Sequence, residues 1–73
     1  MRAAVLQLVH GGWPILVRVD YAALKYGDRV EVAGAQLRRD GTPQGRVWLT
    51  VDAQDLPTAL VGWVELPHMP GVR

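Results

Sequence analysis

Residues 24–32, Leu-Lys-Tyr-Gly-Asp-Arg-Val-Glu-Val, combine a turn with the start of a strand. Gly27 tolerates a positive φ, and the side chain of Asp28 can hydrogen-bond nearby backbone groups, so these two residues predict a tight turn. From position 29 to position 32, polar and apolar residues then alternate. A period of two is typical of a strand with one buried face. We expect the other strands of the chain to wrap around this one.

Turn residues divide the rest of the chain into short segments with strand patterns. These segments are residues 3–9, 15–21, 29–32 with an extension toward 39, 46–52 and 61–66. We expect residues 22–26 to form a connector of about one helical turn. Gly34 is expected to bend the sheet or to mark a bulge. Because Pro67 and Pro70 exclude a central strand, we expect residues 67–73 to form a tail or an edge.

The alternation also predicts which side chains face the core. In the second segment Ile15, Val17, Val19 and Tyr21 are expected on one face, and Leu16, Arg18 and Asp20 on the other. In the segment 46–52 the apolar residues Val47, Leu49 and Val51 are expected inward, which turns Trp48 and Thr50 outward. If Val64 packs in the core, Trp63 faces outward as well. The facing of residues 3–9 stays open, and so does their partner, the same sheet or another subunit.

The 73 residues are enough for one domain, and no cysteine is present to form a disulfide. Five or six short strands with glycines at the corners predict an all-β fold, a small barrel with little or no helix. The net charge of +1 indicates no general attraction to nucleic acid or to an anionic membrane. The apolar run near residue 5 is too short for a secretory leader, and no segment reaches the length of a membrane span. We therefore expect a cytoplasmic protein that does not bind membranes.

From position 19 to position 66 the chain resembles the Src-homology-type (SH3-like) barrel, including its bacterial version. The matching motifs are Asp20-Tyr21, Leu-Lys-Tyr-Gly-Asp-Arg-Val-Glu-Val at 24–32, Val-Trp-Leu-Thr-Val at 47–51 and Gly-Trp-Val-Glu-Leu at 62–66. The resemblance implies a small barrel built on residues 19–66. Residues 3–9 lie outside it and are expected as an extra N-terminal strand, and we expect residues 1–73 to form a single domain. In peptide-binding members, aromatic side chains form a groove for proline-rich ligands. Here Val47, Glu65 and His68 stand at three of those groove positions, so the resemblance does not imply a proline-rich ligand.

The residue inventory does not predict an enzyme. Serine and cysteine are both absent, so the common activated nucleophiles are missing. Asp52 and Asp55 are better explained as turn and capping groups than as an acid–base pair. His10 and His68 stand at opposite ends of the chain and lack the spacing of metal ligands. We predict no catalytic residue, no metal site, no cofactor and no small-molecule substrate.

The aromatic residues are the main candidates for a binding surface. An outward-facing Trp48 and Trp63 would form one exposed patch if their strands were neighbours, and Trp13 beside Pro14 would extend it. Tyr21 and Tyr26 are expected at the edge of this patch. Exposed aromatic clusters usually mark contact surfaces, which predicts a protein partner or self-association. The alternative interpretation is that the tryptophans cover the open ends of the barrel.

A second candidate surface is basic. Arg38, Arg39 and Arg46 flank the turn at residues 40–45, and Trp48 is close enough in sequence to stack on a base. Such a loop would bind nucleic acid through phosphate contacts and stacking. Arginines around a hairpin also occur as a solvated face that keeps an edge strand unpaired. Nucleic-acid binding is therefore the alternative function.

Overall fold

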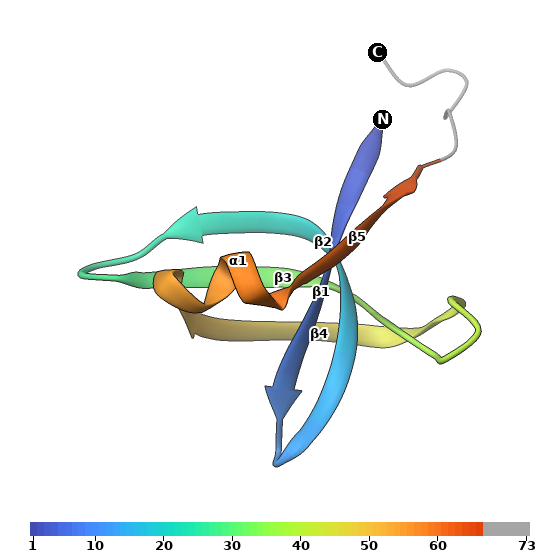
Figure 1. Ribbon diagram of the computed structural model, residues 1–73, viewed down its shortest axis with the longest axis horizontal. Coiled ribbons are helices and arrows are strands. Elements are labelled where there is room, and N and C mark those ends of the chain that lie inside the picture. The colour runs from blue at the N-terminus through green and yellow to red at the C-terminus, as the bar shows by residue number, and fades with distance from the viewer. Residues whose placement is uncertain (67–73) are drawn as a thin grey trace.

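In the computed structural model, residues 1–66 are described and form a small all-β domain. Its elements are β1 (Arg2–His10), β2 (Trp13–Leu24), β3 (Arg29–Leu37), β4 (Pro43–Asp52), the 3-10 helix η1 (Ala53–Asp55), α1 (Leu56–Ala59) and β5 (Leu60–Glu65) (Figure 1). The prediction of an all-β fold with five strands and little helix is confirmed. The predicted tail at residues 67–73 lies outside the described residues. Within residues 1–66, no helix combines the length and the apolar character that crossing a membrane requires.

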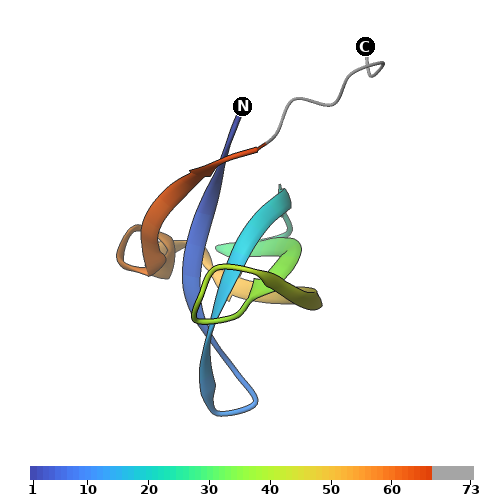
Figure 2. The same ribbon diagram turned by 90° about the vertical axis from the view of Figure 1, so that its right-hand side faces the viewer.

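All five strands belong to one antiparallel sheet with the order β4-β3-β2-β1-β5. The first four strands follow one another as a meander, and β5 returns to pair with β1. Strand β2 is strongly curved, so β1 and β5 run steeply across the direction of β3 and β4 (Figures 1 and 2). This curvature fits a small barrel-like fold. The central strand of the order is β2 and not β3, and β1 pairs within its own chain on both sides.

The turn before β3 forms as expected, but β2 is longer than the sequence pattern suggested. Gly27 has φ = 64°, and the Lys25 N–H donates to the Arg29 carbonyl oxygen at 2.9 Å. The predicted helical connector at residues 22–26 is wrong. Ala22 and Leu24 continue the ladder opposite Val32 and Val30, because pairing with β3 satisfies their backbone groups.

A β-bulge in β2 reverses the predicted facing of one aromatic residue. Val19 pairs with Gly34 and Tyr21 pairs with Ala33, which leaves Asp20 as the additional residue. The prediction of a bulge near Gly34 is confirmed, although the inserted residue lies on the neighbouring strand. Tyr21 therefore shares the face of Ala33 and not that of Val17 and Val19. Its predicted place on the same face as Ile15, Val17 and Val19 is wrong, because the bulge shifts the alternation by one residue.

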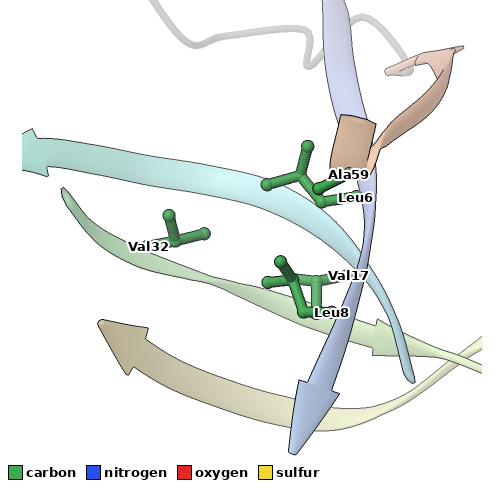
Figure 3. Close-up of a cluster of buried hydrophobic side chains, with 5 residues drawn as sticks. All are labelled: Leu6, Leu8, Val17, Val32 and Ala59. Atoms are coloured by element: carbon green, nitrogen blue, oxygen red, sulfur yellow. The ribbon is translucent and has the colours of Figure 1, made fainter. Parts of the chain in front are cut away.

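The main core lies on the inner face of the curved sheet and is covered at one end by α1. It consists of five buried side chains, Leu6, Leu8, Val17, Val32 and Ala59 (Figure 3). The half-buried Val47, Leu49 and Val51 pack against it from β4, as the alternation predicted. Val17 is 0% exposed and occupies its centre.

A smaller cluster of buried residues lies on the opposite, outer face of the sheet. Val5, Ala35 and Leu37 form it, and Leu16 and Val64 pack against it. Val64 thus contacts the outer cluster and not the main core. Neighbouring side chains on a strand point to opposite faces, so Trp63 is turned toward the inner face.

Candidate contact surface

Two aromatic rings from different strands pack together on the outer face of the sheet. Tyr21 on β2, Ala33 on β3 and Trp48 on β4 are in register across three strands. Ala33 is nearly fully buried, and its small side chain lets the rings approach across it to a centroid distance of 5.6 Å, tilted by 40°. The residues of this Tyr21–Trp48 pair remain 45% and 64% exposed. The pair presents apolar area to solvent in a fixed arrangement.

A carboxylate holds the indole of Trp48 on one side. Its Nε1–H donates to Glu31 Oε2 at 2.6 Å, and Lys25 Nζ lies 3.8 Å from the same oxygen. A hydrogen bond to a charged acceptor is stronger than one between neutral groups. The orientation of the ring is thus set before any partner arrives.

The bulge residue Asp20 organises the other side of the aromatic pair. Arg46 donates to Asp20 Oδ2 at 2.6 Å, and Arg18 Nε lies 3.9 Å from Asp20 Oδ1. Within residues 1–66, the buried Arg18 Nε atom has no hydrogen-bond partner. Together with Lys25 and Glu31, these side chains place three cationic and two anionic groups around the rings. The surface therefore carries both signs of charge.

Tyr26 extends this surface beyond the end of the sheet. It lines a shallow groove of about 460 Å³ together with Lys25, Arg29 and Thr50. Thr50 lies on the same face of β4 as Trp48. Three of the five predicted aromatic contact residues, Tyr21, Tyr26 and Trp48, thus lie along one side of the molecule.

Trp63 belongs to a different surface, so the predicted single patch with Trp48 is not formed. The two residues lie on β5 and β4, which are the opposite edges of the sheet and not neighbours. Trp63 is 55% exposed and stacks under the guanidinium of Arg2, 5.4 Å from its ring centroid. It borders an almost entirely apolar groove of about 410 Å³, whose wall includes Leu6, Ala22, Leu56 and Leu60.

Trp13 is also separate from the outer aromatic pair. It faces His10 across the β1–β2 hairpin and is largely exposed. The hairpin projects away from the rest of the sheet (Figure 1).

Two of the three predicted nucleic-acid contacts, Arg38 and Arg46, make hydrogen bonds within the molecule. Arg38 donates to the Pro43 carbonyl oxygen at 2.8 Å and to Thr42 Oγ1 at 3.3 Å, so it braces the β3–β4 loop from within. Hydrogen bonds from the hydroxyl and the N–H of Thr42 lower the pKa of Asp40 in the same loop. Arg46 lies on the outer face with Asp20, and Arg39 is exposed near the loop.

The acidic residues after β4 have structural partners. Arg29 donates to Asp52 Oδ1 at 3.1 Å, and the backbone oxygen of Asp55 accepts from the Thr58 hydroxyl at 3.0 Å. In the part of the chain that the structure describes, no three His, Cys, Asp or Glu residues are grouped as metal ligands would be. His68, considered above with His10, lies outside that part.

Sequence reasoning missed the contacts that organise the outer face. Asp20, Glu31 and Lys25 were not predicted as site residues, although they hold the rings and cations in place. A glycine within a strand pattern, Gly34, was the available signal for a bulge that would turn Tyr21 toward Trp48. No protein-family model, curated protein or solved structure matches this chain.

Proposed function

We propose that this protein is a non-enzymatic small β-barrel of SH3-like type that acts as a protein–protein interaction module. The SH3-like assignment is supported by the four-strand meander, the short helical turn between β4 and β5, and the return of β5 to β1. Motifs at residues 20–21, 24–32, 47–51 and 62–66 agree with it. A fold alone does not specify a ligand, because function depends on the groups that a particular surface presents.

The exposed Tyr21–Trp48 pair is the observation on which the proposed function depends. Both ring orientations are constrained, because the rings pack on each other and Trp48 donates to Glu31. Pre-ordered side chains lose little conformational entropy on binding, which favours affinity. Trp and Tyr are also the residue types most enriched among those that dominate interface energetics.

The charges around the pair favour a protein over a nucleic acid. Glu31 and Asp20 offset two of the three cations around the rings, so the surface lacks the strong positive charge that attracts a phosphate backbone. Of the three arginines in the alternative function, Arg38 holds its own loop through the Pro43 carbonyl oxygen and the Thr42 hydroxyl. A partner with an apolar centre and charges of both signs at its rim complements this surface.

A capture experiment with matched variants tests the function. The wild-type chain is immobilised and exposed to extract, in parallel with Trp48→Ser/Tyr21→Ser and with Trp13→Ser as control. We expect a protein species that the control retains and the double variant loses, with binding weakened at least about 30-fold, which corresponds to roughly 2 kcal/mol. Loss of the captured material after nuclease treatment, or equal capture by both variants, would contradict the proposal.

A further inference from the structure

Strand β4 has a regular, unprotected edge. It is the terminal strand of the order, and only β3 pairs with it among the described residues. The register places a bulge at Gln44 and the 3-10 helix begins at Ala53, so regular pairing runs over residues 45–52. Residue 45 is a glycine, so the side chains of the regular stretch are those of residues 46–52. This stretch contains neither proline nor lysine, the residues that commonly prevent edge strands from pairing.

The regular stretch Arg-Val-Trp-Leu-Thr-Val-Asp is self-complementary about its middle residue, Leu49. An antiparallel copy centred there places Arg46 opposite Asp52 of the second copy, and likewise Asp52 opposite Arg46. Trp48 then faces Thr50 on the outer face, and Val47 faces Val51 on the inner face. Leu49 meets its own equivalent at the two-fold axis.

Charge complementarity selects this register over its neighbours. Shifts of one residue would set inner-face side chains against outer-face ones, so only even shifts are allowed. A shift of two residues puts Arg46 opposite either Thr50 or Gln54, and both charge pairs are lost. Only the register centred on Leu49 opposes cation and carboxylate at both ends.

The groups that this pairing requires are accessible. The side chains of Arg46 and Asp52 are 63% and 42% exposed, and each makes one short ion pair within its own chain. The remaining N–H groups of the guanidinium and the second carboxylate oxygen are left for a partner. Val47, Leu49 and Val51 are only half-buried, and a neighbouring strand would complete their cover.

Open space adjoins the same edge. A groove of about 610 Å³ is lined by Thr50, Val51 and Asp52 together with the β1–β2 hairpin and α1. Successive strand residues point to opposite faces, so a groove that touches all three runs along the edge of β4. In the proposed register, Arg46 of the second copy lies beside the C-terminal end of β4. Asp52 and Asp55, which line the groove, are at that end.

We propose that two copies of this chain form a symmetric dimer by antiparallel pairing of β4 with β4, centred on Leu49. The dimer has one continuous outer face with two Tyr21–Trp48 pairs flanking the axis. This inference rests on the proposed function, because it identifies a second copy of the chain as one of the protein partners. Its test needs only the purified chain, so the two proposals can fail separately.

Charge reversal provides the first test, measured as molar mass by sedimentation across concentration. The wild type is expected to reach twice the 8.0 kDa of one chain. In a dimer of either single variant, Arg46→Asp or Asp52→Arg, positions 46 and 52 carry the same charge. Both of the 46–52 pairs across the axis are then repulsive, so each variant is expected to remain monomeric. Mixed in equal amounts, the two variants oppose only unlike charges and are expected to form a heterodimer, which also shows that both are folded. Arg39→Asp, an equal charge change outside β4, should dimerise like the wild type.

Cysteine substitution provides the second test and determines the register. The chain has no cysteine, so Leu49→Cys introduces a single thiol at the axis. Residues directly opposite in an antiparallel pair have Cα atoms about 4.5–5.5 Å apart, which suits a disulfide. Thr50→Cys is the matched control, because its equivalent lies about 7–8 Å away on the diagonal and does not link readily.

A Leu49→Cys dimer that links on oxidation, together with rescue in the charge-reversed mixture, supports the proposal. A wild-type monomer at every concentration, a closed ring of more than two copies, or linkage by Thr50→Cys instead would overturn it. If the chain is monomeric but capture still depends on Trp48, the dimer is wrong and the proposed function stands. If the chain dimerises but capture does not depend on Trp48, the dimer stands and the proposed function is wrong.

Discussion

The α-carbon of Gly34 lies so close to the carbonyl oxygen of Arg18 that a Cβ atom at position 34 would overlap it. This contact lies next to the bulge at Asp20 in β2. The bulge places Tyr21 on the outer face. The aromatic surface therefore depends on the absence of a side chain at one position in β3.

Gly34→Ala is expected to destabilise the protein by roughly 1–3 kcal/mol or more, because backbone atoms must move to admit the methyl group. Unfolding in urea, followed by circular dichroism, measures the change. Gly62→Ala is the matched control, since a Cβ there meets no atom within 4 Å and its φ is not positive. Equal stability of the two variants would contradict the close approach at Gly34.

Val17→Ala is expected to cost about 2–3 kcal/mol, because the fully buried side chain leaves a cavity in the main core. A core of this size rarely supplies more than roughly 3–5 kcal/mol of net stability, so the variant should be close to unfolding at room temperature. Val61→Ala removes an exposed side chain and should change stability by less than about 0.5 kcal/mol. Thermal unfolding of both variants compares the two sites.

The indole N–H of Trp48 is expected to exchange with solvent more slowly than those of Trp13 and Trp63, because it alone of the three donates to a carboxylate within residues 1–66. The three indole signals can be followed by NMR. Glu31→Ala should accelerate exchange at Trp48 and leave the other two unchanged. Similar rates for all three indoles in the wild type would mean that the hydrogen bond is not maintained in solution.

The carboxyl group of Asp40 is expected to titrate with a pKa below the ordinary value of 3.8, chiefly because the Thr42 hydroxyl donates to it. The folded-state pKa is depressed, so the loop gains stability above the ordinary pKa and loses it as the pH falls through the folded value. Thr42→Val should raise the pKa of Asp40, measured by NMR titration. Thr58→Val, which removes a hydroxyl bonded elsewhere, should not affect it.

Much of the fold could be predicted because it depends on local patterns. The alternation at residues 47–51 predicted the inner and outer faces of β4, and Gly27 predicted the turn before β3. Prediction failed at residues 22–26, where short apolar side chains without clear periodicity are compatible with either a helical turn or a strand. Pairing with β3 decides between them, and the partner residues of 22–24 are residues 30–32, in the next strand of the chain.

The candidate site was only partly predictable for a related reason. Trp48, Tyr21 and Tyr26 were identified as exposed aromatic residues, but so were Trp13 and Trp63, which lie elsewhere. Sequence patterns do not tell which strands become the edges of the sheet. The expected contact between Trp48 and Trp63 required β4 and β5 to be neighbours, whereas the sheet places them at opposite ends.

By itself, the amino-acid sequence determined the all-β character of the fold, the turn before β3 and the alternation within β4, because these follow from side-chain type and spacing. The tertiary structure alone decided which aromatic residues meet. One inserted residue at Asp20 reverses the facing of all later positions in β2, and strand order arises from pairing between distant segments. Neither effect is encoded in a local pattern, so the Tyr21–Trp48 surface exists only once β2, β3 and β4 have paired.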